Sequence, residues 1–282
     1  MDKVEDTIFK NGSATYYWSS QLFPREVRHD VLRLYSFLRV ADDYVDARPA
    51  QPHHFALLHR AWDHAKNDPH FISAPEPDDT VDERVIKNIV GLTRTHGFDI
   101  AWVEAFWNAM QADLDAAQYQ ELDDVLGYVH GSAEVVGLMM VKIMGLTPAS
   151  YQTAMLQGRA MQWINFIRDI QEDTEMGRCY FPRADFSDCG LVSLNEAEAR
   201  KNPAAFRRLV RLELNRYKSW QNEARQGFGF VPGLLRPALK TAVDMYDWTA
   251  AQIAKDPFIV LERQVKPAKS QVFLRGIRNL AP

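Results

Sequence analysis

The chain has 282 residues, of which 46% are hydrophobic and 25% charged, a balance that excludes intrinsic disorder. Its net charge of -4 gives no electrostatic basis for nucleic-acid binding. The two cysteines, Cys179 and Cys189, are too few for a disulfide scaffold and are typical of a reducing compartment. The opening segment MDKVEDTIFK does not resemble a secretory signal, and no apolar run reaches the ~20 residues that span a bilayer. We therefore expect a cytoplasmic protein, at most peripheral to a membrane.

Hydrophobic periodicity predicts helices along nearly the whole chain. The first follows Pro24, carries apolar residues at 31, 34, 35 and 38, and runs past Asp46 to end before Pro49. Further helices are predicted over 52–66, 81–95, 100–118, 122–144, 149–175, 203–225 and 237–254. Segments 67–79 and 178–194 contain prolines and are predicted to be irregular, and the glycine-rich segment 227–233 is predicted to connect two helices. Strand-like alternation is scarce, so we expect a single all-α domain over residues 1–282.

Two acidic stripes are the most informative feature of the sequence. On a helix, residues four apart share a face, so Asp42 lies above Asp46 and Asp169 above Asp173. Both pairs are embedded in apolar sequence, where carboxylates are costly. The same two faces carry further polar side chains, namely Tyr35, Arg39, Gln162 and Asn165.

A third acidic segment shows that the DDxxD pattern alone is weak. Residues 78–82 match the pattern by letter, but they follow Pro75 and Pro77 and have no apolar helix before them. We assign this segment to a solvated helix start, where acidic side chains complement the helix dipole.

The stripes have a chemical rationale if the two helices face each other. Carboxylates ~4 Å apart repel by ~4 kcal/mol per pair at an effective dielectric near 20, so cations must neutralise them. Oxygen ligands without His or Cys favour Mg²⁺, which commonly bridges to phosphates. Arg39 and Arg168 beside the acids suit capture of the same anion, and Asn165 and Gln162 add neutral oxygen ligands. The pattern therefore predicts a diphosphate held by Mg²⁺ and released as a leaving group.

Apolar and aromatic residues near the stripes are candidates for a hydrocarbon-binding cavity. Small side chains at Ala133 and Gly137 would leave room for a chain. Aromatic residues at helical spacing more often form core alone, so only the whole set indicates a cavity. The set comprises Phe37, Tyr128, Ala133, Val136, Gly137, Met140, Trp163 and Phe166.

The sequence resembles the squalene/phytoene synthase family of head-to-head prenyltransferases. The resemblance covers nearly the whole chain and rests on the segments GSATY (12–16), LFP (22–24), LYSFLR (34–39), DDYVD (42–46), GYVHGSA (127–133), 162–173 and GRCYFP (177–182). It implies an isoprenoid-synthase helical bundle with a central active-site cavity. It also implies two or three Mg²⁺ ions bound with the diphosphate.

The resemblance also implies roles for individual residues. Asp42 and Asp46 would bind metal and the diphosphate of one substrate, and Asp169 and Asp173, with Asn165, would serve the other. The remaining residues expected to bind substrate or lie near the reacting centre are Thr15, Tyr35, Arg39, Tyr128, Ala133, Gly137, Gln162, Phe166, Arg168, Arg178 and Tyr246. Ala14 departs from the family, which often has Lys there, so one cationic contact is in doubt.

The implied reaction ionises one prenyl diphosphate, joins it to the second through a cyclopropylcarbinyl diphosphate, and ends in a linear product. Water must be excluded because it would quench each cation. We favour two geranylgeranyl diphosphates and phytoene, reached through prephytoene diphosphate without NADPH. The alternative is a C15 enzyme that joins two farnesyl diphosphates to presqualene diphosphate, dehydrosqualene, hydroxysqualene or squalene. Because the product is hydrophobic, transient membrane contact is expected, and the oligomeric state is left open.

Two other classes compete with this interpretation. A di-iron helical bundle requires two Glu-x-x-His pairs, and only Glu26 with His29 fits. A non-enzymatic helical protein that assembles or binds a membrane surface would carry its acidic faces by chance, and it would show no Mg²⁺-dependent release of diphosphate.

Overall fold

The computed structural model describes residues 3–280 and is helical with no strand over that range. Its α-helices are α1 Lys3–Gly12, α2 Ala14–Ser20, α3 Arg25–Asp46, α4 Pro52–Lys66, α5 Val81–His96, α6 Ile100–Leu114, α7 Leu122–Val129, α8 Val135–Ile143, α9 Tyr151–Arg168, α10 Ile170–Glu175, α11 Arg183–Cys189, α12 Glu196–Lys201, α13 Pro203–Ala224, α14 Arg236–Lys255 and α15 Lys269–Leu280. A π-turn, η1 His130–Glu134, and 3-10 turns, η2 Pro148–Ser150, η3 Arg225–Phe230 and η4 Pro257–Leu261, connect some of them. The all-α fold predicted from periodicity is confirmed.

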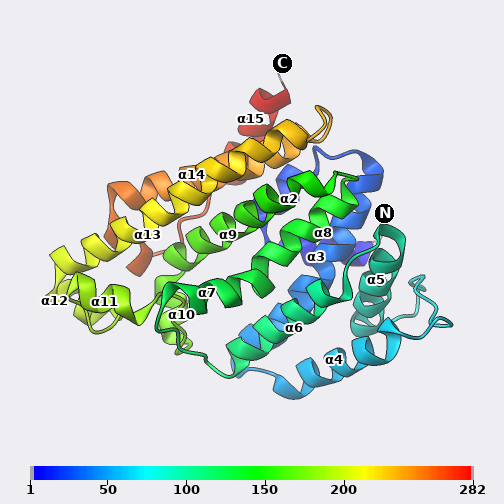
Figure 1. Ribbon diagram of the computed structural model, residues 1–282, viewed down its shortest axis with the longest axis horizontal. Coiled ribbons are helices and arrows are strands. Elements are labelled where there is room, and N and C mark those ends of the chain that lie inside the picture. Colours follow the sequence, from blue (N-terminus) through cyan, green and yellow to red (C-terminus); the bar gives the residue numbers. More distant parts are fainter. Residues whose placement is uncertain (1–2, 281–282) are drawn as a thin grey trace.

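Helix α9 is the central element of the packing. It contacts α13 on one side and η1 and α8 on another, and α14 also packs against it (Figure 1). Helix α3 packs between α1, α5, α4 and α6. Large side chains fill the interior, including Phe37, Trp62, Trp107, Trp163 and Phe206. The two helices that carry the acidic stripes are therefore fixed by buried packing on several sides.

Several helix bounds agree closely with the periodicity. Helix α4 spans the predicted 52–66, α14 extends the predicted 237–254 by one residue at each end, and 67–79 contains no helix. Helix α6 ends at Leu114, earlier than the predicted 118, because the backbone leaves helical geometry at Ala116, where φ is 49°. The segment 227–233 connects α13 to α14, as predicted.

Two helices that were predicted to be continuous are interrupted in the structure. The helix predicted over 122–144 is interrupted by the π-turn η1, a wider turn that hydrophobic spacing does not reveal. The helix predicted over 149–175 breaks at Asp169, whose φ of -102° and ψ of 15° leave the helical region. The segment 178–194, predicted to be irregular, contains α11. Helices α1, α2, α12 and α15 were not predicted.

The acidic segment 78–82 lies at the start of α5, as expected. Thr80 caps this helix and forms a capping box with Glu83, whose side chain accepts from the Thr80 backbone N–H at 2.8 Å. Asp79 binds Lys87 at 2.6 Å, and Asp82 accepts a hydrogen bond from Tyr44 at 2.6 Å. These carboxylates belong to local helix-start and surface contacts.

Among the residues 3–280, the structure contains no helix that is both long and apolar enough to cross a membrane. Cys179 and Cys189 are both free thiols.

Candidate functional site

The two acidic stripes are joined directly by an arginine. Arg178 donates to the Asp46 carboxylate at 2.5 Å and to the Val45 carbonyl at 3.0 Å. Arg178 reaches α3 because the chain turns back at Gly177, whose φ of 75° suits a glycine, and the Arg178 N–H bonds the Asp173 carbonyl at 2.8 Å. The element after the second stripe is thereby held against the end of the first.

The carboxylates of the two stripes share one electrostatic environment. Burial, followed by repulsion from Asp46, raises the pKa of Asp42 to about 8. Burial, followed by repulsion from Asp169, raises the pKa of Asp173 to about 8, and Asp46 of the other stripe raises it further. Such a cluster favours protons or cations, as the spacing of the acids predicts.

Arginines beside each stripe neutralise part of this charge. Arg39 binds Asp42 at 3.1 Å and Asp43 at 2.5 Å from the same helix. Arg168 donates from Nε to Asp169 at 2.8 Å and makes a second contact to the same carboxylate. Their planar guanidinium groups match the geometry of phosphate oxygens as well as of carboxylates.

Asn165 has the character of a metal ligand. Its Oδ1 is buried and has no hydrogen-bond partner, whereas its Nδ2 donates to Gln162 at 3.5 Å. A buried amide oxygen without a partner is costly unless something occupies it. Together with Asp42, Asp46, Asp169 and Asp173 it offers oxygen donors alone, the ligand type that Mg²⁺ prefers, although no three of these four carboxylates lie within 4.8 Å of one another in the structure.

An apolar cavity of about 320 Å³ adjoins these oxygen donors. Tyr35, Gln162 and Asn165 of the stripes line it, so the carboxylates lie beside its wall. The rest of its wall comes mainly from apolar residues of α2, α3, α8, α9, η3 and α14. The predicted lining residues that do line it are Ala133, Val136, Gly137 and Met140.

The lack of a side chain at Gly137 and at Gly158 has a further structural consequence. A Cβ on Gly137 would lie 2.4 Å from the Ala154 carbonyl oxygen, and a Cβ on Gly158 would lie 2.4 Å from the Ala133 carbonyl oxygen. The missing side chains therefore let η1 and α8 approach the backbone of α9 closely. We predicted small side chains as room for a substrate, but here they also set the spacing of the helices that form the cavity.

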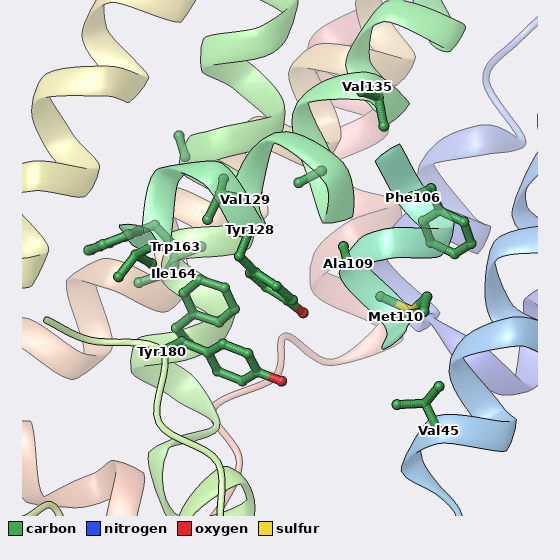
Figure 2. Close-up of a cluster of buried hydrophobic side chains, with 14 of the residues drawn as sticks. Val45, Phe106, Ala109, Met110, Tyr128, Val129, Val135, Trp163, Ile164 and Tyr180 are labelled. Atoms are coloured by element: carbon green, nitrogen blue, oxygen red, sulfur yellow. The ribbon is translucent and has the colours of Figure 1, made fainter. Parts of the chain in front are cut away.

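The large aromatic residues predicted to line the cavity lie outside its wall. Phe166 stacks on Tyr180 with ring centroids 4.4 Å apart and packs against Trp163. Tyr128 stacks on Tyr180 at 5.1 Å, and Figure 2 shows the hydroxyls of these two tyrosines pointing to the same side. Phe37 packs on Trp107 and Phe106. Helical spacing cannot distinguish a cavity wall from the core behind it, and the predicted roles of Tyr128 and Phe166 toward a substrate stay predictions.

Asp113 of α6 is a central residue that the sequence did not single out. Its two carboxylate oxygens accept hydrogen bonds from Tyr128 and Tyr180, each at 2.7 Å. Burial raises the pKa of Asp113 to about 6, although the two tyrosine hydroxyls lower it. It raises the pKa values of Asp42 and Asp173 in turn, so it adds a fifth carboxylate to the cluster. The only feature of the sequence that could have identified Asp113 is its position as the single aspartate in a largely apolar helix.

The remaining predicted residues lie at the edges of the site. The Tyr246 ring lies 5.6 Å from that of Tyr16, which lines the cavity, and burial raises the pKa of Tyr246. Thr15 is half-buried and outside the cavity wall. Lys266, which was not predicted, lies near Arg168 and Asp169. Burial and Arg168 lower its pKa.

An all-helical protein with paired aspartate stripes beside an apolar cavity has the architecture of an isoprenoid synthase. A family model described as squalene/phytoene synthase matches residues 9–271. The chain belongs to the squalene/phytoene synthase family.

Relatives and solved structures agree with this family. The chain is 30% identical over 247 residues to 15-cis-phytoene synthase of Enterobacter agglomerans, covering 83% of this chain and 80% of that one. It is 29% identical over 227 residues to the chloroplastic phytoene synthase 3 of Zea mays, covering 78% of this chain but only 51% of the plant protein. A dehydrosqualene synthase crystal structure superposes with a TM-score of 0.81 at 20% identity over 98% of this chain and 94% of that one. The crystal structure of squalene synthase HpnC from Alicyclobacillus acidocaldarius superposes with a TM-score of 0.71 at 24% identity. The match covers 91% of this chain and 94% of that one. At these identities the two structures establish the shared fold.

Proposed function

We propose that this protein condenses two geranylgeranyl diphosphates head to head to phytoene, through prephytoene diphosphate. The observation that carries the proposal is the Arg178–Asp46 contact, which joins the two aspartate stripes beside one apolar cavity. Two diphosphate-binding stripes at one hydrocarbon pocket suit a reaction in which both substrates ionise in turn. Similarity to the 15-cis-phytoene synthases of Enterobacter agglomerans, Paracoccus sp. and Pantoea ananas supports the C20 substrate.

The residues proposed to hold Mg²⁺ are Asp42, Asp46, Asn165, Asp169 and Asp173. Bound Mg²⁺ would neutralise the carboxylates and stabilise the charge that develops on the leaving diphosphate.

The protein's own side chains supply the other requirements. Arg39, Arg168 and Arg178 are proposed to exchange part of their carboxylate contacts for diphosphate oxygens. The apolar wall of the cavity would hold the hydrocarbon chain and keep water away from the allylic cation. Tyr35 and Tyr16 would place their ring faces at the wall nearest the stripes, where cationic character develops.

The second candidate is a C15 enzyme that acts on farnesyl diphosphate. It is favoured by the high structural similarity to a dehydrosqualene synthase, although at 20% identity that similarity concerns the fold. Both candidates require the same stripes and differ in the length of chain that the cavity accepts.

Product analysis distinguishes the candidates. Purified protein with Mg²⁺ is incubated with the C20 or the C15 diphosphate, with and without NADPH, and the extracted hydrocarbons are analysed by mass spectrometry. We expect a C40 product from the C20 substrate, independent of NADPH. A C30 product formed at a higher kcat/KM would establish the alternative, and no product from either substrate would reject the function.

We also propose that the protein is cytoplasmic and hands its hydrophobic product to a membrane. A C40 hydrocarbon cannot remain dissolved in water, because each buried CH2 group favours an apolar environment by about 0.8 kcal/mol. Release into a bilayer is the natural end of the reaction.

A further inference from the structure

Helix α15 exposes an apolar strip to solvent. Large hydrophobic side chains are uncommon on the surface of residues 3–280, yet Phe273, Leu274, Ile277 and Leu280 are all more than half exposed. At 100° per residue these four positions fall within one third of the helix circumference. We call them the α15 strip. The side of the helix that packs on the protein carries Val272 and Gly276, which are buried. An apolar patch of this kind on a folded surface marks a binding site.

Basic residues border the α15 strip on both sides. Lys269 lies one helical turn before Phe273 at one edge of the strip, and Arg278 lies one turn after Leu274 at the other edge. Both are exposed, and the helix contains no acidic residue, although the whole chain has a net charge of -4. Their long side chains can extend away from an apolar layer toward charged headgroups. An apolar strip with a basic residue on each side is the pattern of a helix that lies in the interface of an anionic bilayer.

The helix is held firmly in this orientation. On α14, Asp244 accepts from Arg275 at 2.8 Å and from Asn279 at 3.0 Å. On the other side, a Cβ on Gly276 would lie 3.1 Å from Leu22, which follows α2, so the helix packs closely there. The polar side chains on the inner face of α15 are therefore hydrogen-bonded to α14. The α15 strip already faces outward, so α15 does not have to move to expose it.

The supports of α15 are also walls of the cavity. Ser20 and Phe23, on either side of Leu22, line the cavity, and so do Ala242 and Val243 beside Asp244. Figure 1 shows α15 packed on the outside of α14 and α2. A bilayer on the α15 strip would thus lie one helix layer from the hydrocarbon pocket. Near the end of α15, Asn279 accepts a hydrogen bond from Lys240 of α14 at 2.8 Å.

We propose that the α15 strip, with Lys269 and Arg278, docks the protein on an anionic lipid bilayer. A second copy of the chain is a poorer occupant for two reasons. A helix of this length presents a strip only about 18 Å long, whereas a stable interface buries about 800 Å² per partner. A two-fold contact would also set the basic borders of the strip against each other without an acidic residue to pair them. The purpose of the docking, product release, rests on the proposed function, but the docking itself does not require it.

The test is vesicle sedimentation with the full-length chain and no substrate. Vesicles contain phosphatidylcholine alone or with 30 mol% phosphatidylglycerol, and partition constants are compared. We expect F273S/L274S/I277S to lower binding at least tenfold to both vesicles. We expect K269E/R278E to weaken binding mainly to anionic vesicles, since each basic residue near such a surface contributes about fivefold.

The chain offers a matched control in I72S/V192S, which removes two exposed hydrophobic side chains from other surfaces and should leave binding unchanged. All three variants should retain the wild-type circular dichroism spectrum and Tm, since the substituted side chains are exposed. Equal binding by wild type and the α15 variants would overturn the proposal. So would a wild-type dimer in sedimentation velocity that the triple variant converts to monomer without any change in vesicle binding.

Turnover measured separately in detergent distinguishes the two proposals. Loss of vesicle binding with full turnover in detergent is the expected behaviour of the α15 variants. Absence of turnover in the wild type would reject the proposed function and leave the docking result standing.

Discussion

Each carboxylate of the site carries a negative charge close to other negative charges, which is unfavourable, and neighbouring arginines offset part of that cost. Asp42 and Asp173 are half-buried near other acids, and Arg39 and Arg178 place positive charge beside them. The Asn165 Oδ1 has no protein partner at all. Residues arranged for binding a ligand often cost stability in its absence, and this site has that character.

This charge arrangement predicts how stability depends on pH. Asp42 and Asp173 have pKa values of about 8 in the folded protein, compared with ordinary values near 4. The folded state therefore binds more protons than the unfolded state between these values, and the free energy of unfolding decreases as pH rises from about 4 to about 8. In EDTA, we expect Tm at pH 5.5 to exceed Tm at pH 8 by at least about 2–4 °C, the effect of roughly 1 kcal/mol in a protein of this size.

Substitution of the two carboxylates tests the cause. The variants D42N and D173N should each reduce the pH dependence, and Mg²⁺ should raise Tm at pH 8 more in the wild type than in either variant. Thermal scans at both pH values measure this. A wild-type Tm that rises with pH across this range would contradict the assignment.

A second prediction at this scale concerns Tyr128. Its hydroxyl donates to Asp113 rather than lining the cavity, so Y128F should destabilise the fold by about 1–2 kcal/mol through the lost hydrogen bond. Activity per folded molecule should fall less than tenfold. Urea denaturation and initial rates give both numbers. Tyr151, whose ring packs on Trp102, provides the matched control Y151F, which should change stability little. A loss of activity of 100-fold or more in stable Y128F would instead make the hydroxyl catalytic.

At the scale of elements, close contact between helix backbones shapes the cavity. Gly158 of α9 faces the Ala133 carbonyl so closely that a Cβ would lie 2.4 Å from its oxygen. We expect G158A to cost about 1–3 kcal/mol, because backbone rather than a flexible side chain must move. Gly127 in α7 has no atom within 4 Å of an added Cβ. There G127A should be neutral or stabilise by up to about 1 kcal/mol, since Ala favours a helix.

Equilibrium unfolding in urea measures both glycine variants. The pair is informative because the same chemical change is predicted to have opposite signs. A G158A protein as stable as the wild type would show that η1 and α9 do not approach as closely as described.

Comparison of the predicted and observed helices shows which features hydrophobic periodicity can predict. Helix α4 was predicted with its bounds because prolines and polar residues delimit an amphipathic pattern. The break at Asp169 and the π-turn η1 were missed because the apolar spacing of the sequence continues through both. The acidic stripes could be predicted because helical spacing fixes which side chains share a face. Asp113 could not, since only packing brings it to Tyr128 and Tyr180.

For the whole molecule, the single domain over residues 1–282 is still a prediction. Residues 3–280 contain a hydrophobic core that connects α1 to the segment after η4, through Phe9, Phe37, Trp163 and Val265. One such core should melt as a unit. We expect a single calorimetric transition whose van't Hoff and calorimetric enthalpies agree. Two resolved transitions would contradict a single domain.

The central claim is that two facing aspartate stripes bind metal and release diphosphate from prenyl diphosphates. Its most direct measurement is Mg²⁺-dependent release of diphosphate from geranylgeranyl diphosphate, with farnesyl diphosphate run in parallel. The chain contains its own control in Asp78, an exposed member of the DDxxD-like segment outside the site. We predict that D42N and D169N lower the release rate by about 100-fold or more, whereas D78N retains the wild-type rate. Wild-type rates in D42N and D169N, or no Mg²⁺-dependent release with either substrate, would contradict the account.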